Sequence, residues 1–345
     1  MTRLEQLGRE LKSPLLVTNL VNILYLTGFE SSNAALLVRP RGETTLYTDF
    51  RYIEIARDVR GVEVEMTKRA VIADIGPRLT GTVQFEADAL PYSQWEQLAP
   101  GKAKLVPSSG VVERLRAVKD DEEVAKIARA AKSADRGLEA LTAETWVGRS
   151  ERELAWRLHE LLHAHGADEL SFETIVASGP NGALPHGRPT DRIVEANTLV
   201  TVDWGVRVDD YCSDCTRTFA TGSLSGELAR AYDVCLDAQQ RACSAIRAGL
   251  TGVEADAVAR EPITDAGFGK NFGHGLGHGV GLMVHEAPRL STESTDTLEA
   301  GHIVTIEPGI YLEGVGGVRI EDLAVVRDDG VELLTSFPKH LISVA

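Results

Sequence analysis

The stretch GRSERELAWRLHELLHAHG, residues 148–166, has the same residue pattern as a second stretch, GLTGVEADAVAREPITDAG, residues 249–267. Both begin with Gly-x-Ser/Thr-x-x-Glu, a pattern in which the hydroxyl and the carboxylate reciprocally cap the first turn of a helix. In both, the glycine that ends the stretch comes 16 positions after the capping hydroxyl residue. The two stretches therefore predict two helices of matching length.

The surroundings of these stretches repeat as well. A longer Ala-rich helical segment precedes each, at 120–141 and at 225–248, and a segment rich in β-formers follows each. Helix, helix and strands, occurring twice, predict an α+β domain made of two halves around a pseudo-two-fold axis. Pro262 lies inside the second stretch and predicts a kink or a shorter helix there.

The N-terminal part of the chain has a different pattern. In residues 1–107, strand-like segments (SPLLVTN, AALLVRP and TTLYTDF) alternate with helix-like segments such as DFRYIEIARDV. Pro107-Ser-Ser-Gly110 resembles a linker, and a segment rich in Ala, Glu, Lys and Arg follows it. We therefore expect a smaller α/β domain at 1–115 and the duplicated domain at 116–345.

The composition excludes several function classes. The chain has 345 residues, 43% of them hydrophobic and 25% charged, as in globular proteins, and its formal net charge of −15 disfavours nucleic acid and anionic membranes as partners. No apolar run approaches membrane-spanning length and MTRLEQLGRELKS has no apolar signal core, so we expect a cytoplasmic protein. The cysteines should be reduced, and a single Cys212-x-x-Cys215 is a weak zinc signal, so we expect both to be packing residues.

The β-rich segment of the first half places two carboxylates on one face. In NTLVTVDWGVRVDDYCSDCTRTFATG, apolar β-formers lead to Asp203, turn-forming residues follow, and β-formers resume. A hairpin centred between Val208 and Asp209 would set Asp203 opposite Asp214. Opposed residues of an antiparallel pair share a face, with Cβ atoms roughly 5 Å apart.

The second half repeats this arrangement. In HIVTIEPGIYLEGVGGVRIEDLAVV, a glycine-rich turn near Gly314 sets Glu307 opposite Glu321. Pro308 cannot donate to a sheet ladder, so a bulge there could shift the register. Both halves are thus predicted to place a pair of carboxylates on adjacent strands among Val, Ile and Leu.

Four carboxylates gathered in an apolar sheet are costly unless they are compensated. Protonation or Arg319 could neutralise some of them, but multivalent cations do so more effectively, since each cation neutralises two charges. The alternative is that the four are exposed residues on unrelated hairpins. Carboxylates with one imidazole suit Mn²⁺ or Co²⁺, with Zn²⁺ as a further possibility.

A glycine-rich stretch, FGHGLGHGVGLMVHE at 272–286, contains three histidines among five glycines. The dinucleotide pattern G-x-G-x-x-G fails because His278, Val280 or Leu282 occupies the place of the third glycine, and no G-x-x-x-x-G-K-[S/T] loop or HExxH motif is present. This excludes the common nucleotide-binding loops and favours a backbone that brings His278 to the carboxylates.

Together these residues resemble the pita-bread metallopeptidases, specifically the Xaa-Pro branch that contains prolidase and aminopeptidase P. The motifs that carry the resemblance span roughly 183–325 in the order and spacing of the family: ALPHGRPTD, VTVDWG, YCSDCTRTF, GHGLGHGVGLMVHE, IVTIEPGIY and GGVRIEDL. The N-terminal portion is similar, in size and α/β pattern, to the accessory creatinase-N-like domain of this branch.

The resemblance implies a site with two divalent metal ions, of which Mn²⁺ is favoured. It implies five ligands, with the second and the last bridging both metals: Asp203, Asp214, His278, Glu307 and Glu321. It also implies that His186 and His285 contact the substrate around the scissile bond, while we expect His274 to support the site. Glu307 would in addition move the proton from water to the leaving group.

Arg319 has two possible roles. Strand alternation directs it to the metal face, where its guanidinium could grip a substrate carboxylate or pair with a metal-ligating carboxylate. A similar arginine occurs in both dipeptidases and aminopeptidases of this branch, so it does not decide between them.

The resemblance implies an Xaa-Pro dipeptidase acting on short proline-containing peptides, with aminopeptidase P as the alternative, and a homodimer. A metal-free binding protein or a non-peptide hydrolase of the same fold is disfavoured because all five ligand positions hold the expected residues.

Overall fold

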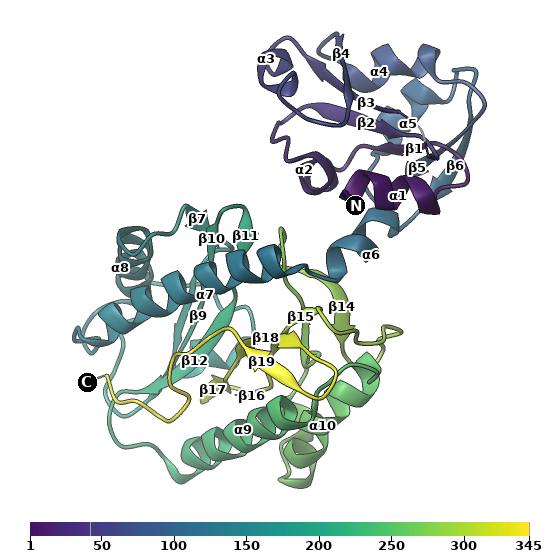
Figure 1. The fold of residues 1–345 in the computed structure, drawn as a ribbon. Helices are drawn as coiled ribbons and strands as arrows, with labels where there is room; N and C mark the ends of the chain where they lie inside the picture. The colour runs from purple at the N-terminus through teal and green to yellow at the C-terminus, as the bar shows by residue number, and fades with distance from the viewer. Residues whose placement is uncertain (42, 345) are drawn as a thin grey trace. The chain divides into compact units, whose positions relative to one another are not determined.

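The computed structural model describes residues 1–41 and 43–344. The chain divides into two compact units, Met1–Arg116 and Ala117–Ala345. Both are drawn in Figure 1, where the colour runs from purple at the N-terminus to yellow at the C-terminus. Across the described residues, no helix combines the length and the apolar composition that crossing a membrane requires.

The first unit contains a six-stranded mixed sheet in the order β4-β3-β2-β1-β5-β6. Its strands are β1 (Leu15–Val17), β2 (Ala34–Val38), β3 (Thr44–Asp49), β4 (Glu63–Thr67), β5 (Thr82–Glu86) and β6 (Lys104–Ser108). Its helices are α1 (Arg3–Glu10), α2 (Leu20–Thr27), α3 (Ile53–Ala56), α4 (Val71–Ile75), the 3₁₀ turn η1 (Gly76–Arg78), α5 (Tyr92–Leu98) and α6 (Val111–Ala117). The α/β character predicted for this part of the chain is confirmed.

The helix predicted for DFRYIEIARDV is much shorter in the structure. Only α3, a single turn, forms there. Ala56 is its one buried residue, whereas Ile55 is exposed. A short helix gains its stability chiefly by packing an apolar face, and this segment packs too little to extend further.

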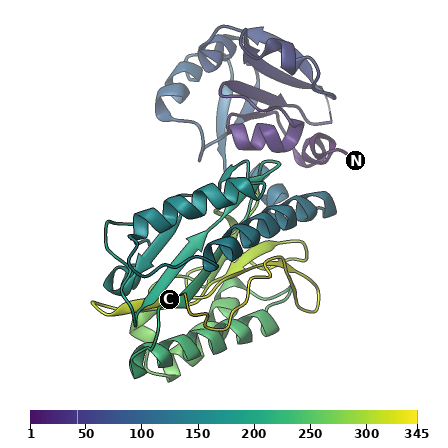
Figure 2. The same cartoon turned by 90° about the vertical axis from the view of Figure 1, so that its left-hand side faces the viewer.

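The second unit contains two helix pairs with strands between them. The helices are α7 (Asp121–Thr142), α8 (Glu151–Ala164), α9 (Gly226–Ala245) and α10 (Gly252–Asp265), with 3₁₀ turns η2 (Gly179–Ala183) and η3 (Gly269–Asn271). Figures 1 and 2 show α7 and α8 on one side of the strands and α9 and α10 on the other. Each pair packs on its own half of the strands and forms a separate apolar cluster.

The strands of this unit form several small sheets, two of which are built alike. In the first half they are β7 (Glu169–Leu170), β8 (Ile175–Ser178), β9 (Leu199–Trp204), β10 (Val206–Val208), β11 (Tyr211–Cys212) and β12 (Cys215–Ala220). In the second half they are β13 (Gly277–Gly279), β14 (Glu286–Leu290), β15 (Ile303–Ile306), β16 (Gly309–Leu312), β17 (Gly316–Arg319), β18 (Asp322–Val326) and β19 (Val331–Leu333). β12-β9-β8 forms one sheet, and β14-β13-β15-β18-β19 forms another.

The predicted duplication is confirmed in detail. α8 and α10 each have 14 residues and each begins with a complete capping box, formed by Ser150 with Glu153 and by Thr251 with Glu254. The residue after each cap also forms an equivalent backbone hydrogen bond, from Glu151 N to Arg192 O and from Gly252 N to Asp296 O. The two halves therefore share their backbone connections as well as their order of elements.

Of the two effects expected of Pro262, a kink or a shorter helix, the shorter helix is wrong. α10 continues through Pro262 to Asp265, and the amide of Ala266 donates to Pro262 O. A proline removes one hydrogen bond of the preceding turn. Here Ala255, Ala259 and Ile263 bury the helix in the core of the second half, which compensates for that loss.

The register of the first hairpin differs from the prediction. Asp203 lies opposite Thr216, and β10 and β11 are joined at Val208 and Tyr211. The two turn residues, Asp209 and Asp210, both have positive φ (49° and 71°). Two-residue hairpin turns of this kind match the twist of the strands and favour Asp or Asn, so the turn is centred one residue later than predicted.

The register of the second hairpin is confirmed. Ile306 pairs with Asp322, and Gly309 pairs with Arg319 on the far side of Pro308. Both pairs correspond to a turn centred on Gly314, whose φ of 72° requires a residue that tolerates the left-handed region. Glu307 and Glu321 occupy the interval between these pairs, at opposed positions, and Pro308 does not shift the register.

Candidate metal centre and active site

Three carboxylates converge where strands of the two halves meet. Asp203 is near the end of β9, Asp214 lies between β11 and β12, and Glu321 lies between β17 and β18. One oxygen of each lies within 4.8 Å of one oxygen of the others. The observed register explains why Asp203 and Asp214 lie close together. Asp203 pairs with Thr216, so Asp214 is diagonal to Asp203 and on the same face of the strands.

His278 and Glu307 complete the cluster. His278 Nε2 lies 3.6 Å from Asp214 Oδ2 and 3.3 Å from Glu307 Oε1. Burial lowers the pKa of His278, but the hydrogen bond and the charge of Glu307 outweigh burial and raise it above its usual value. The structure thus brings together all five residues that were predicted as ligands.

The electrostatics of the cluster are those of a cation site. Burial raises the pKa of Asp214 well above its usual range, and the charges of Glu321 and Asp203 raise it further. Burial and Glu307 likewise raise the pKa of Glu321. Burial also opposes the ionisation of Glu307, but the hydrogen bond and charge of His278 prevail and lower its pKa to about 2.

Two buried carboxylate oxygens in the cluster have no hydrogen-bond partner among the described residues, Asp203 Oδ1 and Glu321 Oε1. Buried polar atoms are normally paired, and an unpaired carboxylate oxygen is costly. Carboxylate oxygens with one imidazole form a donor set for divalent cations. The residues present therefore fit a divalent metal.

Two threonines orient the carboxylates and were not predicted. Thr216 Oγ1 donates to Glu321 Oε2 at 2.7 Å, and Thr305 Oγ1 donates to Glu307 Oε1 at 2.9 Å. Thr305 precedes Glu307 by two residues and Thr216 follows Asp214 by two. Alternation along the strands, which gives residues i and i+2 the same face, could have identified both.

Replacing Thr216 with valine should weaken metal binding without disrupting the sheet. The change removes the donor to Glu321 and the acceptor of the 3.0 Å hydrogen bond from Arg319 Nε. Loss of such an orienting contact costs on the order of 10- to 100-fold in metal affinity or activity. Titration of the metal-free protein with Mn²⁺ measures the change, and an affinity equal to that of the wild type would contradict it.

Arg319 is buried and pairs with a predicted ligand. Its Nη2 donates to Asp203 Oδ2 at 2.7 Å, and its Nη1 donates to the Pro185 carbonyl and to the Tyr311 hydroxyl, both at 2.9 Å. These partners leave little of the guanidinium for a substrate carboxylate. Of the two roles considered for Arg319, the geometry favours pairing with a carboxylate that was predicted as a metal ligand, Asp203.

His274 belongs to the support of the site. Its Nε2 lies 2.8 Å from the hydroxyl of Tyr311, the same hydroxyl that accepts from Arg319. Its Nδ1 lies 2.7 Å from the carbonyl of Gly275, and burial lowers its pKa. Tyr311 was not predicted, and its place in the motif IVTIEPGIY was the only signal for it.

His285 and His186 lie at the exposed side of the cluster. The His285 ring centroid is 4.3 Å from that of His278. Burial and the charge of His278 lower the pKa of His285. His186 is likewise exposed, and it directly follows Pro185, whose carbonyl accepts from Arg319. Both are therefore accessible to a molecule that approaches the carboxylates.

The glycines of 272–286 permit close backbone packing. All of them are described, and none has a positive φ. A Cβ on Gly277 would lie 2.1 Å from Thr305 O, and one on Gly279 would lie 2.2 Å from Ala287 O. The glycines let β13 approach its neighbours closely, which accounts for the expected backbone path that brings His278 to the carboxylates.

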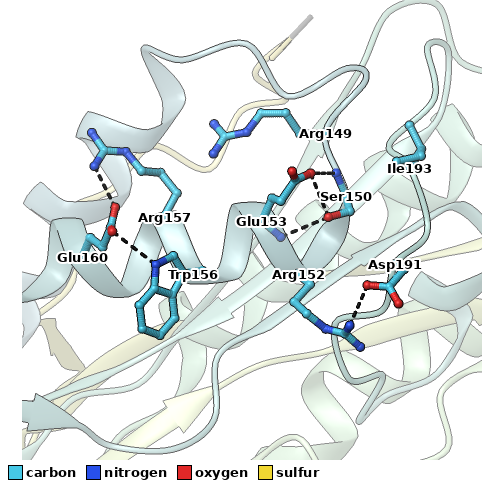
Figure 3. A pocket seen from close by; sticks show the side chains of 9 residues that line it. All are labelled: Arg149, Ser150, Arg152, Glu153, Trp156, Arg157, Glu160, Asp191 and Ile193. Atoms are coloured by element: carbon cyan, nitrogen blue, oxygen red, sulfur yellow. Dashed lines mark hydrogen bonds and ion pairs between the residues drawn. The ribbon is translucent and has the colours of Figure 1, made fainter.

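A separate groove of about 650 Å³ lies along α8 (Figure 3). Its charged side chains pair among themselves and with one neighbour: Arg152 with Asp191, Arg157 with Glu160, and Arg149 with Glu144. None of its lining residues belongs to the carboxylate cluster. The groove is thus separate from the carboxylate cluster, and its charged side chains are engaged in these pairs and in the capping box of Glu153 with Ser150.

Comparison with known proteins agrees with this geometry. Residues 125–328 match the model of metallopeptidase family M24, and residues 4–118 match that of the creatinase/prolidase N-terminal domain. The Xaa-Pro dipeptidase of Pyrococcus furiosus is 35% identical over 324 residues, which are 93% of each chain.

Two solved structures are similar over almost the whole chain. The Xaa-Pro dipeptidase from Bacillus anthracis has a TM-score of 0.95 and 38% identity, covering 99% of this chain and 98% of that one. The X-Pro aminopeptidase from Thermotoga maritima has a TM-score of 0.88 and 34% identity, covering 96% and 97%. The resemblance inferred from the motifs is confirmed, and the chain belongs to metallopeptidase family M24, with the pita-bread fold in its catalytic domain.

Proposed function

We propose that this protein is an Xaa-Pro dipeptidase that hydrolyses the bond before proline in dipeptides. The observation that carries the proposal is the cluster of buried carboxylates with unpaired oxygens beside His278. Two of the three similar proteins described above are Xaa-Pro dipeptidases. Two divalent ions, with Mn²⁺ favoured over Co²⁺ or Zn²⁺, would be held by Asp203, Asp214, His278, Glu307 and Glu321.

The metals and Glu307 have complementary roles in this proposal. Bound divalent ions supply activation of water at neutral pH and polarisation of the scissile carbonyl. Glu307 has a lowered pKa and is ionised at neutral pH, so its carboxylate can accept a proton. It would pass that proton to the prolyl nitrogen, which must be protonated to leave as a neutral amine.

The exposed histidines would bind the reacting carbonyl. The lowered pKa of His285 keeps its ring neutral near pH 7, and a neutral imidazole still has one N–H donor. His285 and His186 lie on the accessible side of the cluster and would donate hydrogen bonds to the oxyanion that forms there. Arg319 would hold Asp203 in place through its 2.7 Å hydrogen bond.

Substrate length tests this proposal. Protein loaded with Mn²⁺ should hydrolyse Ala-Pro and leave Ala-Leu intact, because the reaction is specific for proline. It should cleave Ala-Pro-Ala poorly, as a dipeptidase does. Release of the amino-terminal alanine measures all three, and inactivity on every Xaa-Pro peptide would refute the proposal.

Aminopeptidase P is the second candidate, favoured by the similarity to the Thermotoga maritima enzyme. Strong cleavage of Ala-Pro-Ala, with the dipeptide a poor substrate, would support it instead. On the resemblance to the Xaa-Pro branch, we also propose a homodimer, for which light scattering should give twice the 37.3 kDa mass of the chain.

A further inference from the structure

Glu151, the first residue of α8, is completely buried, and its two carboxylate oxygens accept five hydrogen bonds. Oε1 accepts from Ser178 N at 2.7 Å and from Ser178 Oγ at 2.9 Å. Oε2 accepts from Asn181 Nδ2 at 2.8 Å, from Thr190 N at 3.0 Å and from Thr190 Oγ1 at 2.7 Å. All five donors are uncharged, so the carboxylate is stabilised by hydrogen bonds and by the helix N-terminus.

The five donors come from three residues at or near the two ends of one loop. Ser178 is the last residue of β8, and Thr190 ends the segment 179–190 that follows it. Asn181 lies inside the segment and also donates to Arg188 O. A single buried group thus fixes where the loop begins and where it ends.

This loop reaches the candidate active site. It contains Pro185, whose carbonyl accepts from Arg319, and the next residue along the loop is the exposed His186. Arg319 in turn pairs with Asp203. A displacement of the loop would therefore move a substrate-side histidine and remove one contact of the arginine that holds a ligand.

The second half of the domain shows that helix formation does not need this carboxylate. Gly252 occupies the equivalent first position of α10, where a Cβ would lie 2.1 Å from Arg289 O. In the second half, the corresponding segment is held by one of its own residues and not by the helix: Asp296 accepts a hydrogen bond from Arg289 N at 2.7 Å. Other residues cap both helices, Ser150 with Glu153 and Thr251 with Glu254. The Glu151 carboxylate therefore binds the loop and is not needed to cap the helix.

We propose that Glu151 is a positioning residue for catalysis, which clamps the loop 179–190 so that His186 and the Pro185 carbonyl are held at the active site. The inference rests on the proposed function in that it takes His186 as a substrate contact. The claim that Glu151 fixes the loop depends only on the five hydrogen bonds and not on the proposed function.

The variant Glu151→Gln tests this proposal. A glutamine keeps the size of the side chain, but its amide nitrogen faces either the two donors of Ser178 or the three donors of Asn181 and Thr190. At least two donors thereby lose their acceptor, and the loop should loosen. We expect kcat/KM for Ala-Pro to fall by on the order of 10- to 100-fold, as for small displacements of groups that orient a substrate.

Two further measurements separate positioning from general damage. The metal content of Glu151→Gln should equal that of the wild type, and hydrogen exchange should accelerate in 179–190 but not in α8. Glu153→Gln is the matched control, because it makes the same change two residues along α8, where the Glu153 carboxylate accepts hydrogen bonds from Ser150 of the capping box (Figure 3). Its kinetics and its loop exchange should remain those of the wild type.

The outcomes are distinct. Unchanged kinetics and unchanged exchange in Glu151→Gln would overturn the proposal, as would a loss of bound metal in parallel with activity. If Glu151→Gln does not fold, Thr190→Val removes one of the five donors and should change kinetics and exchange in the same direction, to a smaller extent. If the wild type cleaves no Xaa-Pro peptide, the proposed function fails while loop exchange still tests the clamp.

Discussion

Replacing Asp214 with asparagine should abolish hydrolysis of Ala-Pro and, in the metal-free protein, should raise the temperature of unfolding. Oxygens of Asp203, Asp214 and Glu321 lie within 4.8 Å of one another in a largely buried place. Their mutual repulsion destabilises the metal-free protein and attracts cations to the same place. Asparagine keeps the shape of the side chain and removes its charge, so the site loses affinity for metal while the repulsion decreases.

The expected changes in activity and in melting temperature of Asp214→Asn can be estimated separately. Loss of metal-assisted activation costs several kcal/mol, so kcat/KM should fall by about 10³-fold or more. Each kcal/mol of relieved repulsion should raise the melting temperature of the second unit, Ala117–Ala345, by roughly 2–4 °C. Steady-state kinetics with elemental analysis measures the first effect, and calorimetry in the presence of a chelator measures the second.

Asp210→Asn is the matched control for this experiment. Asp210 is the second turn residue of the same hairpin, with a φ of 71° that asparagine also tolerates. The control should retain metal, activity and melting temperature. An Asp214→Asn protein that keeps its metal and cleaves Ala-Pro like the wild type would refute the assignment of Asp214 as a ligand.

The elements predicted most accurately are those with a signal in their own sequence. The capping boxes of α8 and α10 and the glycine at the centre of the second hairpin turn act within a few residues of where they stand. Such contacts join residues only a few positions apart, so the local sequence pattern is sufficient to predict them.

The first hairpin shows how a local signal can be misread. The dipeptide Asp209-Asp210 occupies a two-residue turn in which both residues have positive φ. Centring the turn one residue earlier paired Asp203 with Asp214 instead of Thr216. The conclusion that the two aspartates share a face survived, because a change of two residues in the partner leaves the alternation of the strand unchanged.

Other parts of the site depend on contacts between distant segments. Arg319 meets the Pro185 carbonyl across 134 residues, and Glu151 holds a loop that ends 39 residues later. Neither contact follows from strand alternation or helical periodicity, since each depends on how two irregular segments pack. The residues that position the predicted ligands and the substrate-side loop are for this reason the part of the site that the sequence predicts least well.

Replacing His285 with alanine should reduce kcat for Ala-Pro by about 10²- to 10³-fold while the metal content remains that of the wild type. This is the cost of removing one hydrogen-bond donor to an oxyanion. His285 lies beside His278, at a centroid distance of 4.3 Å, but is not itself within the carboxylate cluster. The expected signature is therefore a loss of rate at unchanged metal content, opposite to that of Asp214→Asn.

The double variant with His186→Ala distinguishes cooperation from independent action. If both histidines donate to the same oxyanion, their effects are coupled, and the double variant should lose less than the product of the two single losses. His340→Ala, at an exposed histidine near the C-terminus, is the control and should leave kcat unchanged. Wild-type kcat in His285→Ala would remove this residue from the mechanism, whereas loss of metal would make it a structural part of the site.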